Sequence, residues 1–338
     1  MALMADGRYL QQHSLFVEFL NMRIIIIGGT GHVGTFLVPR LVNAGHHVIS
    51  VSRHQRSPYI QNAAWHAVKG VELDRNAAEQ QGVFGKEIAG MDPDIVIDMI
   101  CFNKKNAVQM VNALQGRIKQ YLFCGTIWVY GHSVMIPTEE DQPRKPLSEY
   151  GKNKADTEAY LLEESKQNGF PATILHPGHI VGPGWQPVNP AGNLNPEVFK
   201  KLAHGEEVLL PNLGMETLHH VHADDVAQAF ELAISHASAA KGESFNIVSA
   251  KAMSMRGYAE TMAEYSGKGA NLKFLDWPTW KENVSDEDAR ITWDHLIHSP
   301  CCSIEKARDL LQYQPRYSSI AAIQEALEWQ KRNEHLLK

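Results

Sequence analysis

The chain has 338 residues, a formal net charge of −6, 44% hydrophobic residues and 21% charged residues. This composition is typical of a globular protein with a sizeable core, and the length suggests roughly two domains. The negative charge and the lack of a basic block argue against a nucleic-acid-binding surface. Four cysteines are too few for a disulfide framework, and no apolar run reaches the ~20 residues that cross a bilayer. We therefore expect a cytoplasmic protein without a membrane segment.

A buried strand followed by a glycine-rich turn opens the fold pattern. Four consecutive isoleucines at 24–27 predict a strand that is buried on both faces, and an apolar helix follows the turn. Gly28 permits the tight turn, Gly31 lets the backbone approach a pyrophosphate, and Gly34 lets the helix pack against the strand. In this context a dinucleotide site is a better interpretation than an ordinary glycine-bearing turn. The predicted phosphate-binding residues are Gly28, Thr30, Gly31, His32, Val33 and Gly34.

The residues after the second predicted strand, 48–51, indicate which cofactor binds. An acidic residue normally stands there and accepts hydrogen bonds from the adenosine ribose. This chain has Ser52, Arg53 and Arg56 instead, and guanidinium groups pair well with a 2′-phosphate. We therefore predict NADP, with NAD as the alternative if both arginines are solvated loop charges.

The following segments alternate as a doubly wound parallel sheet requires. The further predicted strands are residues 68–73, 95–100, 121–124, 172–175 and 244–248. Ligands of such sheets bind beyond the carboxyl ends of the strands, so Cys101 and Phe102 belong to the rim of the crevice. Asp74, at the end of the third strand, is placed to reach the adenine; a turn carboxylate is nearly as good an interpretation.

Candidate catalytic residues come at the end of the fifth strand and on the next helix. Tyr150 and Lys154 are four residues apart, so on a helix they share one face, and an ammonium near a phenol favours the phenolate. A free tyrosine titrates near ~10, so the lysine and a positive nicotinamide ring would have to lower its pKa. The hydroxyl of Thr126 would hydrogen-bond the substrate oxygen. A surface pair at helical spacing is the alternative interpretation.

Several motifs in order resemble the extended short-chain dehydrogenase/reductase family, specifically its epimerase/dehydratase branch. They are Gly28 to Gly34, Gly125 to Gly131, Tyr150 with Lys154, His176 to Gly184, and Val221 to Asp225. The resemblance implies an NAD or NADP hydride cycle with Tyr150 as acid/base, Lys154 as its partner and Thr126 as the hydroxyl. We assign Cys101, Pro177 and His179 to the cofactor site together with Tyr150 and Lys154.

The resemblance also implies a division into two domains. The expected fold is α/β, with a Rossmann-type doubly wound parallel sheet and a smaller C-terminal α/β substrate domain. Residues 22–182 and about 217–250 would form the cofactor domain. Residues 183–216 and 251–338 would form the substrate domain.

Three departures from the family pattern narrow the reaction. Family dehydratases have an Asp-Glu pair after the active-site threonine, whereas Ile127 and Trp128 stand here, which disfavours dehydration. Nucleotide-sugar members usually have an arginine that holds the diphosphate near the position of Leu218, so a diphosphate-bearing substrate is in doubt. Asp98 stands where many relatives have a histidine, and its role is open at this level.

The segment 183–196 is rich in proline, glycine and asparagine and predicts a loop over the substrate. Trp185 and Asn189 would contact a polar ligand there or only order the loop, and Phe102 and Trp128 are further substrate candidates. The three histidines at 219, 220 and 222 suggest a metal, but no cysteine or carboxylate follows at ligand spacing, so we predict none.

These observations support an NAD(P)-dependent enzyme that transfers a hydride at a secondary alcohol or ketone of a carbohydrate-like substrate. It would act as an epimerase or as a dehydrogenase/reductase, and a nucleotide-sugar 4-epimerase is the alternative. A cofactor-binding sensor or scaffold without catalysis is the alternative from another class. We expect a small sugar-like substrate, no nucleic acid and no membrane partner, with a homodimer as a possible assembly.

Overall fold

The computed structural model describes residues 21–54 and 56–333. Its centre is a seven-stranded sheet with the order β3-β2-β1-β4-β5-β6-β11, in which every neighbouring pair is parallel. The strands are β1 (Arg23–Ile27), β2 (His47–Ser52), β3 (Lys69–Glu72), β4 (Ile95–Asp98), β5 (Gln120–Cys124), β6 (Ala172–Pro177) and β11 (Ser244–Ile247). The predicted Rossmann-type sheet is confirmed, and each strand lies close to its predicted bounds. The strand order reverses between β1 and β4, where such sheets bind their ligands.

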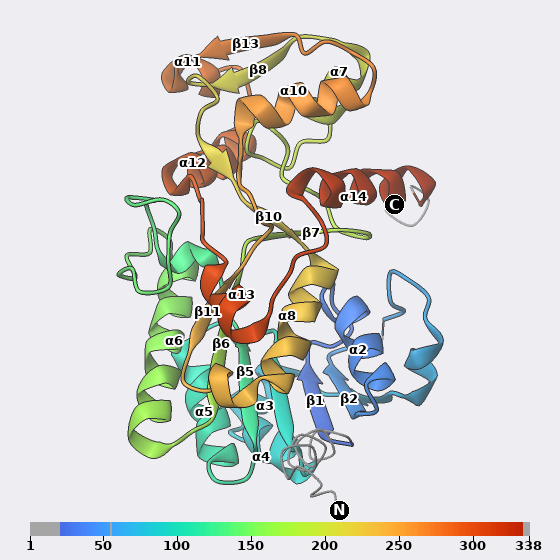
Figure 1. Cartoon of the computed structure of the whole chain (residues 1–338), viewed down its shortest axis with the longest axis vertical. Helices are drawn as coiled ribbons and strands as arrows, with labels where there is room; N and C mark the ends of the chain where they lie inside the picture. Colours follow the sequence, from blue (N-terminus) through green and yellow to red (C-terminus); the bar gives the residue numbers. More distant parts are fainter. Residues whose placement is uncertain (1–20, 55, 334–338) are drawn as a thin grey trace, which may run out of the picture.

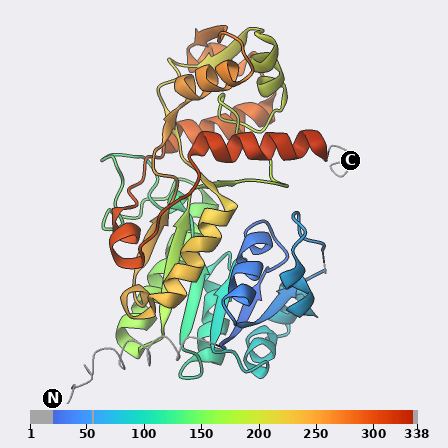
Figure 2. The same ribbon diagram turned by 45° about the vertical axis from the view of Figure 1, so that its right-hand side comes forward.

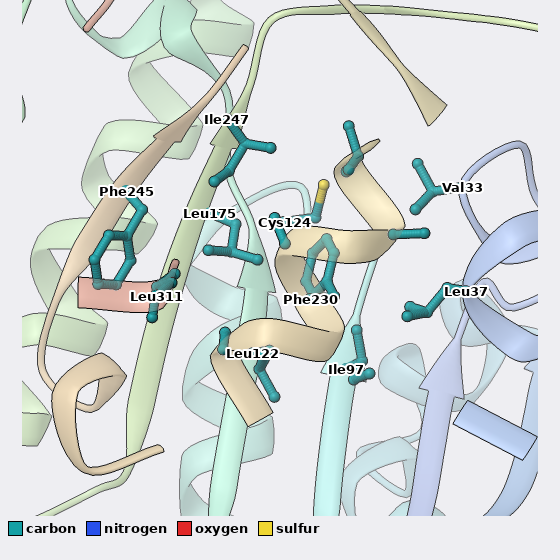
Figure 3. Close-up of a cluster of buried hydrophobic side chains, with 14 of the residues drawn as sticks. Val33, Leu37, Ile97, Leu122, Cys124, Leu175, Phe230, Phe245, Ile247 and Leu311 are labelled. Carbon is teal, nitrogen blue, oxygen red and sulfur yellow. The ribbon is translucent and has the colours of Figure 1, made fainter. Parts of the chain in front are cut away.

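Helices cover both faces of this sheet. One face carries α2 (Gly34–Asn43), α8 (Ala223–Ser235) and α13 (Glu305–Leu311); the other carries α4 (Phe84–Gly90), α5 (Lys104–Leu114) and α6 (Glu149–Asn168). The isoleucines of β1 alternate between the two hydrophobic clusters, because successive strand side chains point to opposite faces. This double burial explains the unbroken isoleucine run. Figure 3 shows the first cluster, with Leu37, Phe230 and Leu311 packed over the sheet.

Short elements connect the main ones. They are η1 (Ala63–Ala67), α3 (Arg75–Gln80), η2 (Ile127–Val129), α9 (Ala237–Ala240), and the pairs β7 (His179–Val181) with β10 (His220–His222) and β9 (Thr217–Leu218) with β12 (Met253–Ser254). Beyond the carboxyl edge of the sheet lies a smaller part of the molecule, at the top of Figures 1 and 2. It contains α7 (Glu197–His204), α10 (Met255–Tyr265), α11 (Trp277–Lys281), α12 (Asp286–His298), α14 (Ser319–Arg332) and the parallel pair β8 (Val208–Pro211) with β13 (Leu272–Leu275).

The smaller part has its own hydrophobic cluster, drawn from residues 181–218 and 255–326. This separate cluster is compatible with the predicted division into a cofactor domain and a substrate domain. The exact domain boundaries stay a prediction. Ala307, Leu311 and Tyr313 pack into the cluster of the sheet, although they fall within the predicted substrate segment. Within the described residues, no helix is both long and apolar enough to span a membrane.

The close packing at Gly34 generates a stability prediction. A Cβ atom at Gly34 would lie 1.9 Å from the carbonyl oxygen of Gly29, and both groups belong to backbone that cannot easily move. Gly34→Ala is expected to lower the free energy of unfolding by about 2 kcal/mol, since overpacking at a fixed site costs ~1–3 kcal/mol. Urea denaturation measures this.

The matched control is Gly90→Ala at the end of α4, where an added Cβ meets nothing within 4 Å. This change should leave stability equal or raise it by up to ~1 kcal/mol, because alanine favours a helix. Equal effects of the two substitutions would contradict the packing argument.

Candidate active site

The turn between β1 and α2 has the geometry that phosphate binding requires. Gly28 has a φ of +88°, which side chains rarely adopt, and its N–H donates to the carbonyl oxygen of Val51 at 2.8 Å. The N–H of Gly31 donates to the carbonyl oxygen of Gly28 at 3.0 Å. The absence of a side chain at Gly34 lets α2 begin directly against this turn. The turn and the helix start together fit a dinucleotide pyrophosphate.

A cavity of about 870 Å³ lies at the carboxyl edge of β3 and β4. It is lined by Arg53, Arg75, Asn76, Glu79, Gln80, Ile100, Phe102, Asn103, Lys105, Asn106 and Gln109. Among the described residues, Arg56 and Asp74 are not part of its wall. Asp74 instead caps α3 by accepting the N–H of Ala77 at 3.0 Å, and the buried hydroxyl of Ser52 donates to the carbonyl oxygen of His54. Of the two arginines predicted for the cofactor site, Arg53 is therefore the one that lines this cavity.

Asp98 does not line this cavity, but it binds Arg75, which does. Its carboxylate accepts Arg75 Nη1 at 2.7 Å and the hydroxyl of Tyr121 at 2.8 Å, and all three side chains are buried. Arg75 also donates to Glu79 at 2.6 Å. A buried carboxylate needs such partners. Asp98, which stands where many relatives have a histidine, is thus paired with Arg75 at the start of α3. The sequence analysis did not identify this arginine.

The three predicted catalytic residues lie together. Ser148 caps α6 by accepting the N–H of Gly151, and the helix presents Tyr150 and Lys154 on one face. Lys154, 2% exposed, donates to the carbonyl oxygens of Cys101 and Cys124 at 2.8 and 2.7 Å. Thr126 follows β5, and its hydroxyl interacts with the hydroxyl of Tyr150.

The electrostatics of this group favour a protonated phenol. Although Tyr150 is 46% exposed, its partial burial raises its pKa to about 12, the nearby Cys124 adds to this rise, and the hydrogen bond with Thr126 opposes it. Burial lowers the pKa of Lys154. At neutral pH Tyr150 is therefore a proton donor, and its use as a base requires an additional positive charge nearby.

A second cavity, of about 420 Å³, is lined by Thr126, Tyr150 and Lys154. Its wall is formed by Met99, Phe102, Cys124, Gly125, Thr126, Trp128, Tyr150, Lys154, Pro177, Gly178, His179, Ile180, Trp185 and His295. The structure therefore brings the predicted catalytic residues to the same wall as Phe102, Trp128, Pro177, His179 and Trp185. Among the described residues, Lys154 is the only lysine, arginine or carboxylate side chain on it.

The substrate assignment of Asn189 is corrected by its burial. Its side chain is 0% exposed and is used within the loop that follows β7. The amide nitrogen donates to the carbonyl oxygen of Asn195 at 2.9 Å, and the amide oxygen accepts the N–H of Ala191 at 2.8 Å. Asn189 therefore orders the loop, which was the alternative interpretation.

Trp185 from the same loop packs on the glycine-rich turn. Its ring stacks on His32 with centroids 4.9 Å apart and an interplanar angle of 7°. Burial, with smaller contributions from His222 and His179, lowers the pKa of His32 to about 3, so the imidazole is neutral. The loop that follows β7 thus contacts the predicted cofactor turn directly.

Two neutral imidazoles complete the wall around the catalytic group. Burial lowers the pKa of His179 to about 3 and also lowers that of His295. His295 lies on α12 and meets the ring of Trp128 edge to face, with centroids 5.4 Å apart. The sequence analysis missed His295, because only the tertiary fold brings α12 to this cavity.

A buried ion pair behind Thr126 was also missed. Arg144 donates to both oxygens of Glu158, at 2.6 and 3.1 Å, and His176 Nε2 lies 3.0 Å from Glu158 Oε1. Burial alone would raise the pKa of Glu158, but His176 and Arg144 hold it at about 2. Glu158 continues the four-residue spacing of Tyr150 and Lys154, which is the signal that could have identified it.

Comparison with known proteins decides the family. A model of the NAD dependent epimerase/dehydratase family matches residues 24–248. The chain belongs to this family. The resemblance in the sequence motifs is thereby confirmed. Within the described residues, no group of three or more His, Cys, Asp or Glu side chains could hold a metal ion.

Individual relatives of this family member are distant. It is 28% identical over 310 residues to the chloroplast stem-loop binding protein of 41 kDa b from Arabidopsis thaliana, covering 89% of this chain and 77% of that protein. It is 25% identical over 283 residues to a UDP-glucose 4-epimerase from Azospirillum brasilense, covering 75% and 80%. The structure of UDP-glucose 4-epimerase with UDP-glucose from Thermotoga maritima matches with a TM-score of 0.70 and 20% identity, covering 93% and 100%. That structural match shows the same fold.

Proposed function

We propose that the protein is an NAD(P)-dependent oxidoreductase or epimerase acting at a secondary alcohol or ketone of a carbohydrate-like substrate. The observation that carries this proposal is the convergence of Thr126, Tyr150 and Lys154 on one cavity beside a glycine-rich turn. When bound, the nicotinamide cofactor would accept or return the hydride. A cytoplasmic location and a homodimer belong to the same proposal.

Each side chain has a distinct task. Tyr150 passes a proton to or from the substrate oxygen, and Thr126 holds that oxygen by a hydrogen bond. Lys154 is fixed by two carbonyl oxygens, so its ammonium stays near Tyr150, 5.9 Å from the centre of the phenol ring. A fixed cation favours the phenolate, but Lys154 does not offset the rise of the Tyr150 pKa to about 12, so use of Tyr150 as a base would also need the positive charge of an oxidised nicotinamide ring.

Removing the hydroxyl of Tyr150 tests the catalytic assignment. Tyr150→Phe is expected to lower turnover at least ~100-fold, since a positioned acid/base group contributes ~10²–10⁴-fold. Cofactor affinity should change little, because the ring remains. Tyr160→Phe, on the same helix but outside the cavity, is the matched control and should keep full activity. Turnover is measured as reduced-nicotinamide absorbance for net oxidation or reduction, and as sugar product separated by chromatography for epimerisation. A loss below about tenfold in Tyr150→Phe would refute the role.

We further propose that NADP is preferred over NAD. Arg53 lines the cavity on the adenosine side, and the end of β2 offers no carboxylate for the ribose hydroxyls. A guanidinium pairs with a 2′-phosphate through charge-assisted hydrogen bonds.

A comparison of two arginines tests this preference. Arg53→Ala should weaken NADP binding about tenfold or more, because a hydrogen bond to a charged group is worth ~1.5–3 kcal/mol, and should leave NAD binding unchanged. Arg56→Ala is the matched control, since Arg56 does not line the cavity among the described residues. Calorimetric titration with both cofactors gives the affinities. Tighter NAD binding by the wild type would overturn the proposal.

The wall of the catalytic cavity supports a substrate without a diphosphate. Leu218 is buried in the hydrophobic cluster of the smaller part, and burial keeps the neighbouring His219 and His220 uncharged by lowering their pKa values. Lys200 is paired with Glu197, and Lys201 lines a different cavity. A diphosphate needs cationic partners, whereas aromatic rings and neutral imidazoles suit the faces and hydroxyls of a free sugar or sugar acid.

A thermal-shift panel tests the substrate class. UDP-, GDP- and dTDP-glucose are compared with glucose, galactose and glucuronic acid in the presence of NADP. A ligand that binds only the folded state raises the melting temperature in proportion to ln(1 + [L]/Kd), so the free sugars are expected to give the larger shifts. Strong stabilisation by one nucleotide sugar alone would favour the nucleotide-sugar 4-epimerase instead.

A non-catalytic cofactor-binding protein is the second candidate. It is favoured by the Arabidopsis relative, whose name describes stem-loop binding. The net charge of −6 is unfavourable for a nucleic-acid surface, and a sensor would have no need for Thr126, Tyr150 and Lys154 in one cavity. Absence of any turnover that depends on Tyr150 would favour this candidate.

A further inference from the structure

A chain of hydrogen bonds joins α6 to the backbone of Thr126. The N–H of Thr126 donates to His176 Nδ1 at 3.1 Å, and His176 Nε2 lies 3.0 Å from Glu158 Oε1. Arg144 holds the same carboxylate from the other side with two hydrogen bonds. All members of the chain except Arg144 are at least nine-tenths buried, so water does not compete for these bonds.

The direction of each hydrogen bond follows from the chemistry of the groups. A backbone N–H can only donate, so His176 Nδ1 must be the unprotonated nitrogen. The single imidazole proton is then on Nε2, which donates to the carboxylate of Glu158. The carboxylate therefore fixes the tautomer and the orientation of the ring, and the ring fixes the N–H of Thr126.

The surrounding backbone is shaped for this contact. A Cβ atom at Gly125 would lie 2.4 Å from His176 Nδ1, so the absence of a side chain there lets the imidazole reach Thr126. Glu158 lies one helical turn beyond Lys154, which itself lies one turn beyond Tyr150. One face of α6 thus carries Tyr150, Lys154 and Glu158, and Glu158 is connected to Thr126 through His176.

We propose that Glu158 and His176 are positioning residues that hold the hydroxyl of Thr126 against that of Tyr150. The inference rests on the proposed function, because it assigns the two residues to the reaction of the same cavity. Neither residue lines that cavity: His176 contacts the backbone of Thr126, and Glu158 contacts His176. Their contribution is the placement of one hydroxyl that would bind the substrate oxygen.

The molecule contains a matched control with the same bonding pattern. His219 is equally buried, its Nδ1 accepts the N–H of Cys302 at 3.1 Å, and its Nε2 donates to the carbonyl oxygen of Ser249 at 2.9 Å. It does not contact Thr126 or line the catalytic cavity. A substitution at His219 therefore measures the effect of losing a buried imidazole that makes two hydrogen bonds, without altering the catalytic cavity.

The test is a set of variants assayed with NADP and two probe substrates, D-glucose and UDP-glucose. His176→Asn can place an amide oxygen near the position of Nδ1, whereas His176→Gln reaches only towards Glu158 and His176→Leu keeps neither bond. We expect His176→Asn to retain kcat within about threefold, and the other two variants to lose about 10- to 100-fold in kcat, the range of a lost buried hydrogen bond. KM and the cofactor Kd should stay within about threefold in all three.

Two further comparisons separate positioning from general stability. In a Thr126→Ala background, His176→Leu should cost less than about threefold in kcat, because the hydroxyl that it positions is already gone. His219→Leu should lower the melting temperature but leave kcat unchanged. Additive losses with Thr126→Ala, or an equal loss of kcat in His219→Leu, would overturn the proposal.

A readout without turnover keeps this inference distinct from the proposed function. In ¹⁵N-histidine spectra of the whole protein, assigned with His176→Asn, the Nδ1 of His176 should be unprotonated and Nε2 protonated. Glu158→Leu should disturb this signal and leave that of His219 unchanged. A protonated Nδ1 would overturn the positioning role whatever the probe substrates do, whereas an inactive wild type with the expected spectrum would count against the proposed reaction alone.

Discussion

The arrangement of the candidate site depends on the hydrogen bonds of the buried Lys154 ammonium to two backbone carbonyl oxygens. The ammonium binds the carbonyl oxygen of Cys101, just beyond β4, and that of Cys124, at the end of β5, so one cation connects both strands to α6. A cation that is 2% exposed is tolerated only because these oxygens replace its water. The same bonds fix the distance between the helix that carries Tyr150 and the strand end that carries Thr126.

Two other buried carboxylates are paired with arginines. Arg75 pairs with Asp98 below the adenosine side, and Arg144 pairs with Glu158 behind Thr126. The wall of the 420 Å³ cavity carries aromatic rings and two imidazoles, His179 and His295, whose pKa values burial lowers. Paired charges therefore lie in the interior, whereas Lys154 is the only lysine, arginine or carboxylate side chain among the described residues on the wall of the 420 Å³ cavity.

The sequence was sufficient to predict the sheet, the glycine turn and the grouping of Thr126, Tyr150 and Lys154, because those depend on local periodicity and spacing. Strand burial on two faces requires unbroken apolar runs such as Ile24 to Ile27, and a shared helix face requires the spacing of Tyr150 and Lys154. His295 and Asp98 could not be interpreted, since their partners are far away in the chain. The side chain of Asn189 turned inward because the loop must satisfy its own backbone groups, a need that composition does not reveal.

The spacing of Tyr150, Lys154 and Glu158 along α6 limits where residues can be inserted into this helix or deleted from it. Tyr150, Lys154 and Glu158 occupy successive turns of one uninterrupted helix. An insertion or deletion of one residue between them would rotate everything beyond it by about 100°. A point substitution alters one of these side chains. An inserted or deleted residue would instead turn one or two of them away from the crevice together. The segment from 150 to 158 is therefore expected to accept altered side chains more readily than an altered residue count.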